Sequence, residues 1–333
     1  MAPENTAAHV AIVGAGVVGL SIALFLSDIG YNVDIVARNF PGDKSIEWSS
    51  PWAGALLAPH PDSGFPELQR ASLQVYNFLA ASEPSSGVRK LKITEFYDDR
   101  PEDEDVWYRT EMSNFRQLDR SELAPGSTVG FSYDGLAVNP NRLLPWIMEK
   151  LRKNRVTVLQ RSIESMEELA MLTGANILIN ASGLGATQLA SDEKMLSIRG
   201  QTMFVKTDFD EAVIFQGSQY TYVIPRASDG GVILGGVLQP NDTRVLPDLS
   251  LRSDILSRVN AITNGAFSWV DPERDVANDI VGFRPSRKGG FRLERERNTI
   301  HAYGFGGLGY LYAFGIAGKV RDMVTDTTTK AKL

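Results

Sequence analysis

The chain has 333 residues, of which 43% are hydrophobic and 22% charged, and this balance is typical of a folded globular protein rather than a disordered or fibrous one. Its formal net charge of −6 argues against nonspecific binding to nucleic acid or to an anionic membrane. With 0 cysteines and 3 histidines (His9, His60 and His301), disulfides, thiolate chemistry, a metal site and a Ser-His-Asp triad are not expected. Length and composition therefore predict about two domains and a small-molecule partner.

The two ends of the sequence carry different information about location. The first apolar run has no basic residues before it and stops at a glycine-rich turn, so no signal peptide is expected. No run reaches the ~18 apolar residues that a membrane span needs. The last residues, Ala331-Lys332-Leu333, are a conservative version of the Ser-Lys-Leu address that a peroxisomal import receptor reads. We therefore expect the protein in the peroxisome matrix if its chemistry produces peroxide.

The beginning of the chain predicts a βαβ unit. His9–Val13 is a short apolar strand, and Leu20–Ile29 has apolar residues at helical spacing and ends at Gly30. Val33–Ala37 predicts the next buried strand. The turn between the first strand and the helix is therefore in the setting that a nucleotide-binding loop requires.

That turn has glycines at the spacing Gly-x-Gly-x-x-Gly. Gly14 makes the tight turn, Gly16 lets backbone N–H groups approach a pyrophosphate, and Gly19 lets the helix pack on the strand. The phosphates then lie at the positive end of the helix. An ordinary strand–helix turn can show the same spacing, but both flanking elements are present, so we expect dinucleotide contacts from Gly14, Ala15, Gly16, Val17, Val18 and Gly19.

The identity of the dinucleotide depends on other segments. The acidic residue that usually ends the second strand is replaced by Ala37-Arg38-Asn39. Arg38 fits the 2′-phosphate of NADP, and it also fits the adenosine phosphates of FAD. Further glycine turns near Gly183 and Gly306 favour FAD, because separate chain segments contact a buried flavin dinucleotide.

The remaining patterns indicate two interleaved units. Helices are predicted at residues 67–80, 141–152 and 310–324, and parallel strands at 156–159 and 177–181. Period-2 apolar patterns within residues 198–236 predict an antiparallel sheet. The predicted fold is α/β: a Rossmann-like FAD-binding domain, approximately 1–80, 140–195 and 295–333, interleaved with an α+β substrate domain built on a mainly antiparallel sheet, approximately 81–139 and 196–294.

Four blocks of sequence resemble the D-amino-acid oxidase family, and its fungal members most closely. They are the glycine loop with Ala37-Arg38-Asn39; Ser50-Pro51-Trp52-Ala53-Gly54-Ala55; Tyr222-Val223-Ile224-Pro225 with Gly235-Gly236; and Gly282-Phe283-Arg284-Pro285 followed by residues 301–307. Their order and spacing cover nearly the whole chain. This resemblance is much more specific than the glycine loop alone.

The resemblance implies a chemistry and a set of residues. It implies an FAD-dependent enzyme that converts a D-amino acid and O2 into a 2-oxo acid, ammonia and hydrogen peroxide. It implies that Arg284 binds the substrate carboxylate with help from the Tyr222 hydroxyl. It also implies that the backbone carbonyl of Gly307 accepts a hydrogen bond from the substrate amino group. It further implies FAD contacts from Ser49, Ser50, Ala53, Gly54, Ala55, Ile163, Ser182, Gly183, Gly306, Gly307, Leu308, Gly309, Tyr310 and Leu311, besides Arg38, Asn39 and the glycine loop.

The residue types themselves leave alternatives open. A guanidinium binds a carboxylate through two parallel bonds, but Arg284 could also form an internal salt bridge. Tyr222 could be a core tyrosine, and Tyr220 points to the same strand face as a substitute. Arg287 and Arg292 are interpreted as surface charges and His301 as structural. These blocks contain no obvious base, which fits hydride transfer to the flavin from an uncharged amine.

Departures from the family pattern bear on selectivity and assembly. Val237-Leu238 follows the Gly-Gly pair, where some yeast enzymes carry a second tyrosine and D-aspartate oxidases an arginine. An apolar wall and a neutral, apolar or aromatic D-amino acid are therefore expected. Glu294–Thr299 leads directly into Ile300, without the long insertion that makes the dimer contact of those yeast enzymes, so a homodimer stays open.

Other activities remain as alternatives. On the same fold, the enzyme could oxidise glycine, N-methyl amino acids or D-aspartate. An NADP-dependent dehydrogenase that uses Arg38, or a flavin-binding protein without turnover, is less consistent with the four blocks. No metal, nucleic acid or membrane partner is expected.

Overall fold

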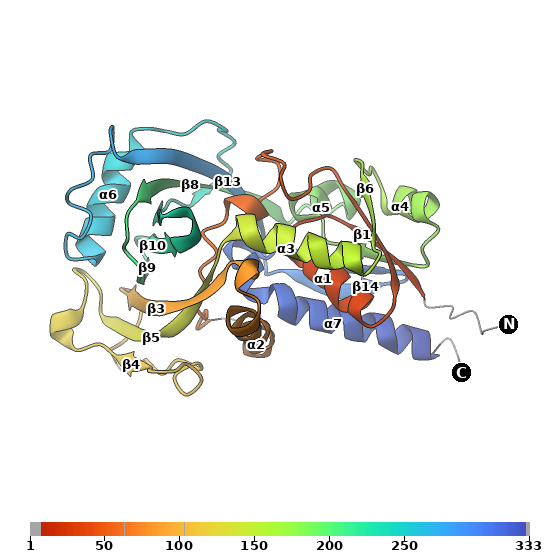
Figure 1. Cartoon of the computed structure of the whole chain (residues 1–333), viewed down its shortest axis with the longest axis horizontal. Coiled ribbons are helices and arrows are strands. Elements are labelled where there is room, and N and C mark those ends of the chain that lie inside the picture. Colours follow the sequence, from red (N-terminus) through yellow and green to blue (C-terminus); the bar gives the residue numbers. More distant parts are fainter. Residues whose placement is uncertain (1–7, 63, 103, 331–333) are drawn as a thin grey trace.

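The computed structural model describes residues 8–62, 64–102 and 104–330, and its strands form two sheets (Figure 1). The first sheet has six strands in the order β14-β15-β7-β1-β2-β6. Its pairs are parallel except for the β14–β15 pair at one edge. The strands are β1 (His9–Val13), β2 (Asn32–Ala37), β6 (Thr157–Gln160), β7 (Ile177–Asn180), β14 (Arg292–Glu296) and β15 (Thr299–Tyr303).

Helices cover both faces of this sheet because its strands are apolar on both sides. One core contains alternate residues of β1 and β7 together with α1 (Val17–Asp28), α3 (Pro140–Lys153) and α7 (Gly309–Lys330). The opposite residues of these strands pack with α4 (Met166–Thr173). The short helix α5 (Ala186–Leu189) follows the glycine turn after β7. This is the doubly wound arrangement that the βαβ pattern predicted.

The second sheet has nine strands and is mainly antiparallel, with one parallel pair, β3–β9. Eight strands follow the order β12-β8-β11-β10-β9-β3-β5-β4, and β13 pairs with β8. The helix α6 (Leu251–Ile262) packs on apolar residues of β8, β10 and β11. The strands are β3 (Val88–Tyr97), β4 (Arg116–Gln117), β5 (Val129–Val138), β8 (Met195–Lys206), β9 (Ala212–Gln216), β10 (Thr221–Arg226), β11 (Gly231–Gly235), β12 (Gln239–Pro240) and β13 (Val276–Arg287).

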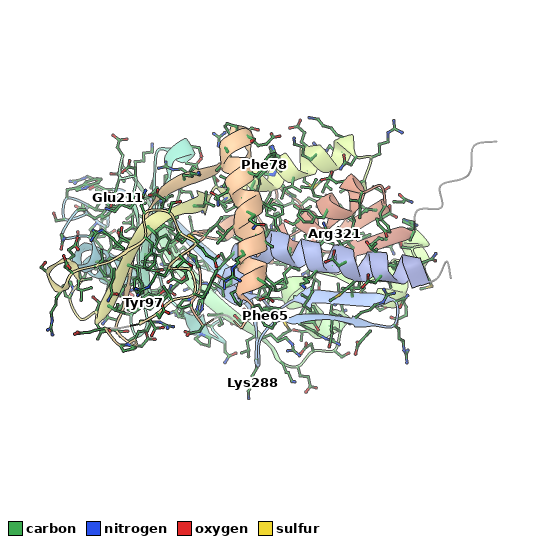
Figure 2. The ribbon with its side chains drawn as sticks, turned by 90° about the horizontal axis from the view of Figure 1, so that it is seen from below. Phe65, Phe78, Tyr97, Glu211, Lys288 and Arg321 are labelled. Atoms are coloured by element: carbon green, nitrogen blue, oxygen red, sulfur yellow. The ribbon has the colours of Figure 1, made fainter. Side chains whose placement is uncertain are left out.

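The chain passes repeatedly between the two sheets, and α2 (Pro66–Ser82) lies where they meet. It contacts α7 on one side and β3 on the other, and in Figure 2 it stands upright between the two halves, with Phe65 and Phe78 labelled along it. The predicted α/β class, with an interleaved antiparallel sheet, is confirmed. Within the described residues, no helix has both the length and the hydropathy that a membrane crossing requires.

Several predicted elements agree with the structure within a few residues, and others were missed. The predicted strands 156–159 and 177–181 correspond to β6 and β7, but they lie on opposite sides of the β1–β2 pair rather than next to each other. The last helix extends from Gly309 to Lys330, six residues beyond the predicted end. The patterns gave no prediction for the long strands β3, β5 and β13, whose partners are distant in sequence.

Candidate active site

The glycine loop forms the start of the site at the carboxyl end of β1. Gly14 has a left-handed φ of +109°, and a Cβ there would lie 2.4 Å from the Ala181 carbonyl oxygen. Helix α1 then begins without a side-chain cap at Gly16 and without an acidic residue in its first turn. The strand–turn–helix geometry therefore leaves a positive helix end for a phosphate, as the glycine spacing predicted.

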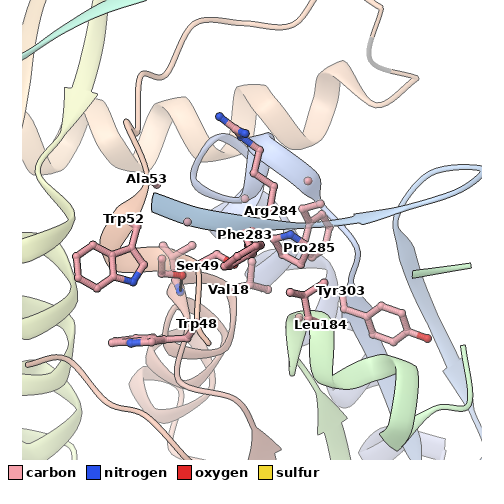
Figure 3. A pocket seen from close by; sticks show the side chains of 18 of the residues that line it. Val18, Trp48, Ser49, Trp52, Ala53, Leu184, Phe283, Arg284, Pro285 and Tyr303 are labelled. Atoms are coloured by element: carbon pink, nitrogen blue, oxygen red, sulfur yellow. Dashed lines mark hydrogen bonds between the residues drawn. The ribbon is translucent and has the colours of Figure 1, made fainter. Parts of the chain in front are cut away.

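The segment 49–55 closes over this loop and is fixed from three sides. The Ser50 hydroxyl accepts the Val17 N–H at 3.0 Å, and the Tyr310 hydroxyl donates to the Ser50 carbonyl at 2.9 Å. The Ser49 hydroxyl donates to the Phe283 carbonyl on β13. Figure 3 shows Ser49 beside Phe283 and Val18. These bonds tie α1, α7 and β13 to one loop, so segments far apart in sequence meet around one cavity.

Most of the predicted cofactor residues line this cavity. They are Gly14, Ala15, Gly16, Val17, Val18, Arg38, Asn39, Ser49, Ser50, Ala53, Gly54, Ala55, Ile163, Ser182, Gly183, Gly306, Gly307, Leu308, Gly309 and Tyr310.

Two of the predicted cofactor residues, Gly19 and Leu311, do not line it. A Cβ at Gly19 would lie 2.0 Å from the Gly14 carbonyl oxygen, so this glycine serves helix packing. Leu311 is buried in the core between the helices and the six-stranded sheet. Tyr310 and Leu311 are consecutive residues of one helix, so their side chains point in different directions. Their position in the sequence does not show which of the two faces the cavity.

Arg284 projects from β13 into the cavity, and Figure 3 shows it on the opposite side of the strand from Phe283. Its Nη1 donates to the Val237 carbonyl at 3.1 Å. A Cβ at Gly200, on the neighbouring strand β8, would lie 2.4 Å from that nitrogen. The structure shows no salt bridge to a carboxylate for Arg284 within the described residues. Most of its five N–H groups therefore remain for a ligand.

Tyr222 lies beside Arg284 and is almost fully buried. Burial raises the pKa of its hydroxyl to about 12, although the Arg284 charge lowers that pKa, so the hydroxyl stays protonated at neutral pH. The Tyr222 ring fills the space above Gly235, where a Cβ would lie 2.5 Å from the ring. Because Tyr222 lines the cavity as well as packing in the core, both predicted environments are present.

The third predicted residue, Gly307, also adjoins Arg284. A Cβ at Gly307 would lie 3.6 Å from the Cδ of Arg284. Tyr220 lies close by, with its ring 5.2 Å from that of Tyr222 and 5.9 Å from the Arg284 guanidinium carbon. The structure therefore brings together a cation, a phenolic hydroxyl and a glycine backbone at one end of the cavity. Gly200 was missed, although its position opposite Gly282 on the paired strands marks a close approach.

The wall that faces a substrate side chain differs from the prediction. Val237 and Leu238 do not line the cavity, and Leu238 is half-exposed, so the predicted wall is wrong. The strand β9 supplies the wall instead, because its alternate residues Ile214 and Gln216 point to the face that carries Tyr222. Further wall residues are Leu56, Ala58, His60 and Ile280.

The charges of the lining residues distinguish the two ends of the cavity. Among the described residues that line the cavity, three are arginines, Arg38, Arg161 and Arg284, and one is a histidine, His60. Arg38 follows β2 and Arg161 follows β6, so both lie at the nucleotide end. Burial lowers the pKa of His60, which is therefore neutral at pH 7. At the substrate end, Arg284 is thus the fixed positive charge of the described lining.

Two arginines after Arg284 correct another expectation. Arg287 pairs with the buried Asp192 at 2.8 Å, and Arg292 donates to the Tyr303 hydroxyl at 3.1 Å, so neither is a free surface charge. Tyr303 in turn donates to Asp192 at 2.8 Å. A local Lys- and Gly-rich turn suggested exposure, but the partners come from other elements. His301 is buried beside Glu296 and does not line the cavity.

Comparison with known proteins identifies the family. A family model described as FAD dependent oxidoreductase matches residues 9–323. This chain belongs to that family. It is 30% identical to a D-amino-acid oxidase of Fusarium vanettenii, over 97% of this chain and 98% of the relative. It is 33% identical to a D-aspartate oxidase of Talaromyces thermophilus, over 96% and 95% of the two chains.

Solved structures support the fold. The glycine oxidase of Geobacillus kaustophilus has a TM-score of 0.76 and 17% identity, and 95% of this chain and 94% of that chain are covered. The predicted resemblance and the predicted flavoenzyme are confirmed, and the coarse activity is FAD-dependent oxidation of an amino acid.

The residues of the cavity fit FAD. A Cβ at Gly16 would lie 3.0 Å from the Ser50 hydroxyl and fill the space in front of the uncapped helix. Gly14–Val18, Ser50 and Ser182 would hold the diphosphate, and Arg38 and Ile163 would hold the adenosine. Within the described residues, no cluster of three or more His, Asp or Glu side chains could hold a metal ion.

Proposed function

We propose that this enzyme oxidises neutral D-amino acids to 2-oxo acids, with O2 as acceptor and ammonia and hydrogen peroxide as further products. The observation that carries the proposal is that Arg284, Tyr222 and Gly307 lie next to one another in the FAD cavity. Curated relatives named D-amino-acid oxidase extend over nearly the whole chain and support the same activity.

Each of the three residues has a distinct binding role. Arg284 takes the α-carboxylate through two parallel charge-assisted hydrogen bonds, for which its planar fork is suited. The protonated Tyr222 hydroxyl donates a further bond to that carboxylate. The Gly307 carbonyl accepts an N–H of the amino group. These contacts hold two substituents of the α-carbon, and the wall receives the side chain as the third. A site that places three substituents fixes the direction of the α-hydrogen and so distinguishes D from L isomers.

The described residues at this end favour hydride transfer. The lining there includes no carboxylate, and His60 is the one described lining group with a pKa near neutrality in its unperturbed form. A substrate amine bound without its extra proton can expel the α-hydrogen as hydride, so no side chain has to remove a proton from carbon. The chemistry that FAD would supply when held by this cavity is acceptance of a hydride and two-electron reduction of O2. The chain contributes orientation and a dry, apolar wall.

The substrate end supports a neutral side chain. Ile214, Ile280, Leu56 and Ala58 bury apolar surface, and Arg284 is already used by the α-carboxylate. A second carboxylate would lose its hydration without gaining a cation from the described wall, which costs several kcal/mol. A relative named D-aspartate oxidase makes D-aspartate the competing candidate, and the composition of this wall argues against it.

A substrate screen tests the proposal. The purified enzyme should show the yellow spectrum of bound FAD and release peroxide with D-alanine, D-methionine and D-phenylalanine, and not with the L isomers. Glycine and N-methyl glycine in the same screen separate the oxidases of those substrates on this fold. Peroxide release with glycine alone would refute the proposed substrate class.

We also propose that the enzyme acts in the peroxisome matrix, where its peroxide could be degraded. The proposal rests on Ala331-Lys332-Leu333, which lies outside the described residues, and on a peroxide-forming reaction. A fluorescent fusion at the N-terminus should enter peroxisomes, and removal of these three residues should leave it in the cytosol. Unchanged import of the shortened protein would contradict this proposal.

A further inference from the structure

Glu95 is a fully buried carboxylate that the proposed reaction does not use. It lies on β3, among tyrosines of the core that surrounds the substrate end. The Tyr108 hydroxyl donates to Oε1, and the Tyr133 hydroxyl donates to Oε2 at 3.1 Å. The Tyr97 hydroxyl and the Arg100 guanidinium also lie close to this carboxylate, and both favour its ionised form. Above pH 7, where the Glu95 carboxyl group is ionised, it only accepts hydrogen bonds and draws the hydroxyl hydrogens toward itself.

Tyr97 connects this buried acid to the cavity. It pairs with Gln216 in the parallel β3–β9 ladder, and the Nε2 of Gln216 donates to the Tyr97 hydroxyl oxygen at 3.1 Å. Because the hydrogen of that hydroxyl points toward Glu95, its oxygen is left to accept from Gln216. The amide nitrogen of Gln216 is therefore turned toward Tyr97. The amide oxygen remains for the cavity that Gln216 lines.

The position of Gln216 determines which substrates reach it. Ile214 pairs with Tyr222, beside the carboxylate site, and Gln216 lies two residues farther along β9. Two residues of a strand span about 7 Å, so the methyl group of D-alanine does not reach Gln216. A longer side chain that follows the strand does.

We infer that Glu95 is a positioning residue: through Tyr97 it orients Gln216, whose amide oxygen accepts a hydrogen bond from a neutral polar side chain of the substrate. The inference rests on the proposed function and specifies which neutral D-amino acids are distinguished. The side chains of D-asparagine and D-leucine have nearly the same shape, but only that of D-asparagine has an N–H to donate. The ratio of their kcat/KM values therefore reports the orientation of Gln216 with little contribution from size.

Substitutions along the chain of hydrogen bonds test the inference in the FAD-loaded enzyme, assayed well above pH 7 so that Glu95 is ionised. Gln216→Leu, Tyr97→Phe and Glu95→Gln should each lower the D-asparagine to D-leucine ratio about three- to tenfold, the value of one hydrogen bond. Glu95→Gln acts because an amide both donates and accepts, so it no longer fixes the direction of the Tyr97 hydroxyl. The loss should fall mainly on KM for D-asparagine. The double variant Glu95→Gln/Gln216→Leu should lose no more than Gln216→Leu alone.

Two controls separate positioning from general damage. Tyr133→Phe removes a hydroxyl from the same buried cluster without touching Gln216, and it should change the ratio less than twofold. D-Alanine turnover should stay within about twofold in Tyr97→Phe, Glu95→Gln and Tyr133→Phe, because none of these three residues lines the cavity.

Three outcomes would overturn the inference. The first is an unchanged ratio in Gln216→Leu or Tyr97→Phe with D-alanine turnover intact, which leaves the proposed function standing. The second is an equal loss for all three substrates in Glu95→Gln, which would make the residue merely structural. The third is a wild-type enzyme that turns over no D-amino acid, which would overturn the proposed function and this inference together.

Discussion

The nucleotide end and the substrate end of the cavity are built from different materials. At the nucleotide end, backbone groups of the consecutive residues Gly14–Val18 face the cavity, and one loop with Ser49 and Ser50 closes over them. At the substrate end, single side chains from β9, β10 and β13 converge, with Gly200 of β8 making room for Arg284. At the first end the strictest requirement is for glycine, because a Cβ at Gly14 or Gly19 would meet a backbone oxygen. The second depends on the identity of each side chain.

The largest expected effect is loss of FAD binding at the nucleotide end. Gly16→Val places methyl groups where the helix start must meet the diphosphate, and its Cβ already lies 3.0 Å from the Ser50 hydroxyl. The variant should purify without bound FAD, as measured by the ratio of flavin to protein absorbance. Gly64→Val is the matched control, because a Cβ at Gly64 has no heavy atom within 4 Å. A fully yellow Gly16→Val protein would place the phosphate site elsewhere.

The next largest effect is loss of substrate binding while FAD stays bound. Arg284→Ala should retain FAD but lose about 3–5 kcal/mol in kcat/KM for D-alanine, because a buried carboxylate loses its partner. Arg284→Lys should recover little, since an ammonium cannot reproduce the fork of the guanidinium. Steady-state peroxide assays measure both variants. Kinetics of Arg284→Ala close to those of the wild type would mean that another residue binds the carboxylate.

A third effect concerns stability rather than turnover. Burial raises the pKa of Glu95 from 4.5 to about 7, so the folded protein resists ionising this group. The fold favours the protonated form. The contribution of Glu95 to the free energy of unfolding is therefore greatest below pH 4.5 and declines as the pH rises to 7. The free energy of unfolding of the wild type, minus that of Glu95→Gln, should fall by about 3 kcal/mol over this range. Denaturant titrations at several pH values measure it, and a flat difference would contradict the buried position.

The smallest effect concerns the selectivity of the substrate end between apolar and acidic side chains. The ratio of kcat/KM for D-phenylalanine, D-methionine or D-valine over D-aspartate should exceed ~100, or about 2.7 kcal/mol. Gln216→Arg should narrow this ratio, because the new guanidinium stands where the described wall lacks a cation. Met171→Arg adds the same charge on the exposed face of α4 and should leave the ratio unchanged. A wild-type preference for D-aspartate would show that the wall was misread.

The difference between the two ends also explains what the sequence could predict. The phosphate loop is contiguous, and the chemistry of a tight turn restricts its residues to glycine, so Gly14 and Gly16 were identifiable without the fold. Arg284, Tyr222 and Gly307 followed from the family resemblance. The wall did not, because Gln216 enters the cavity only through the register of β9 on β3, and Leu238 leaves it where the chain turns outward after Gly236. Pairing between distant strands decides such positions, and local patterns do not record it.

Oxidation of D-amino acids by this enzyme can be followed in the flavin spectrum of the purified protein, mixed without oxygen with D-alanine and, separately, with L-alanine. We expect D-alanine to bleach the yellow absorbance and L-alanine to leave it unchanged. Admitting air should restore the colour with release of hydrogen peroxide. The Arg284→Ala protein should stay yellow under the same conditions. Bleaching by L-alanine as fast as by D-alanine, or no bleaching by any D-amino acid, would contradict the proposed activity.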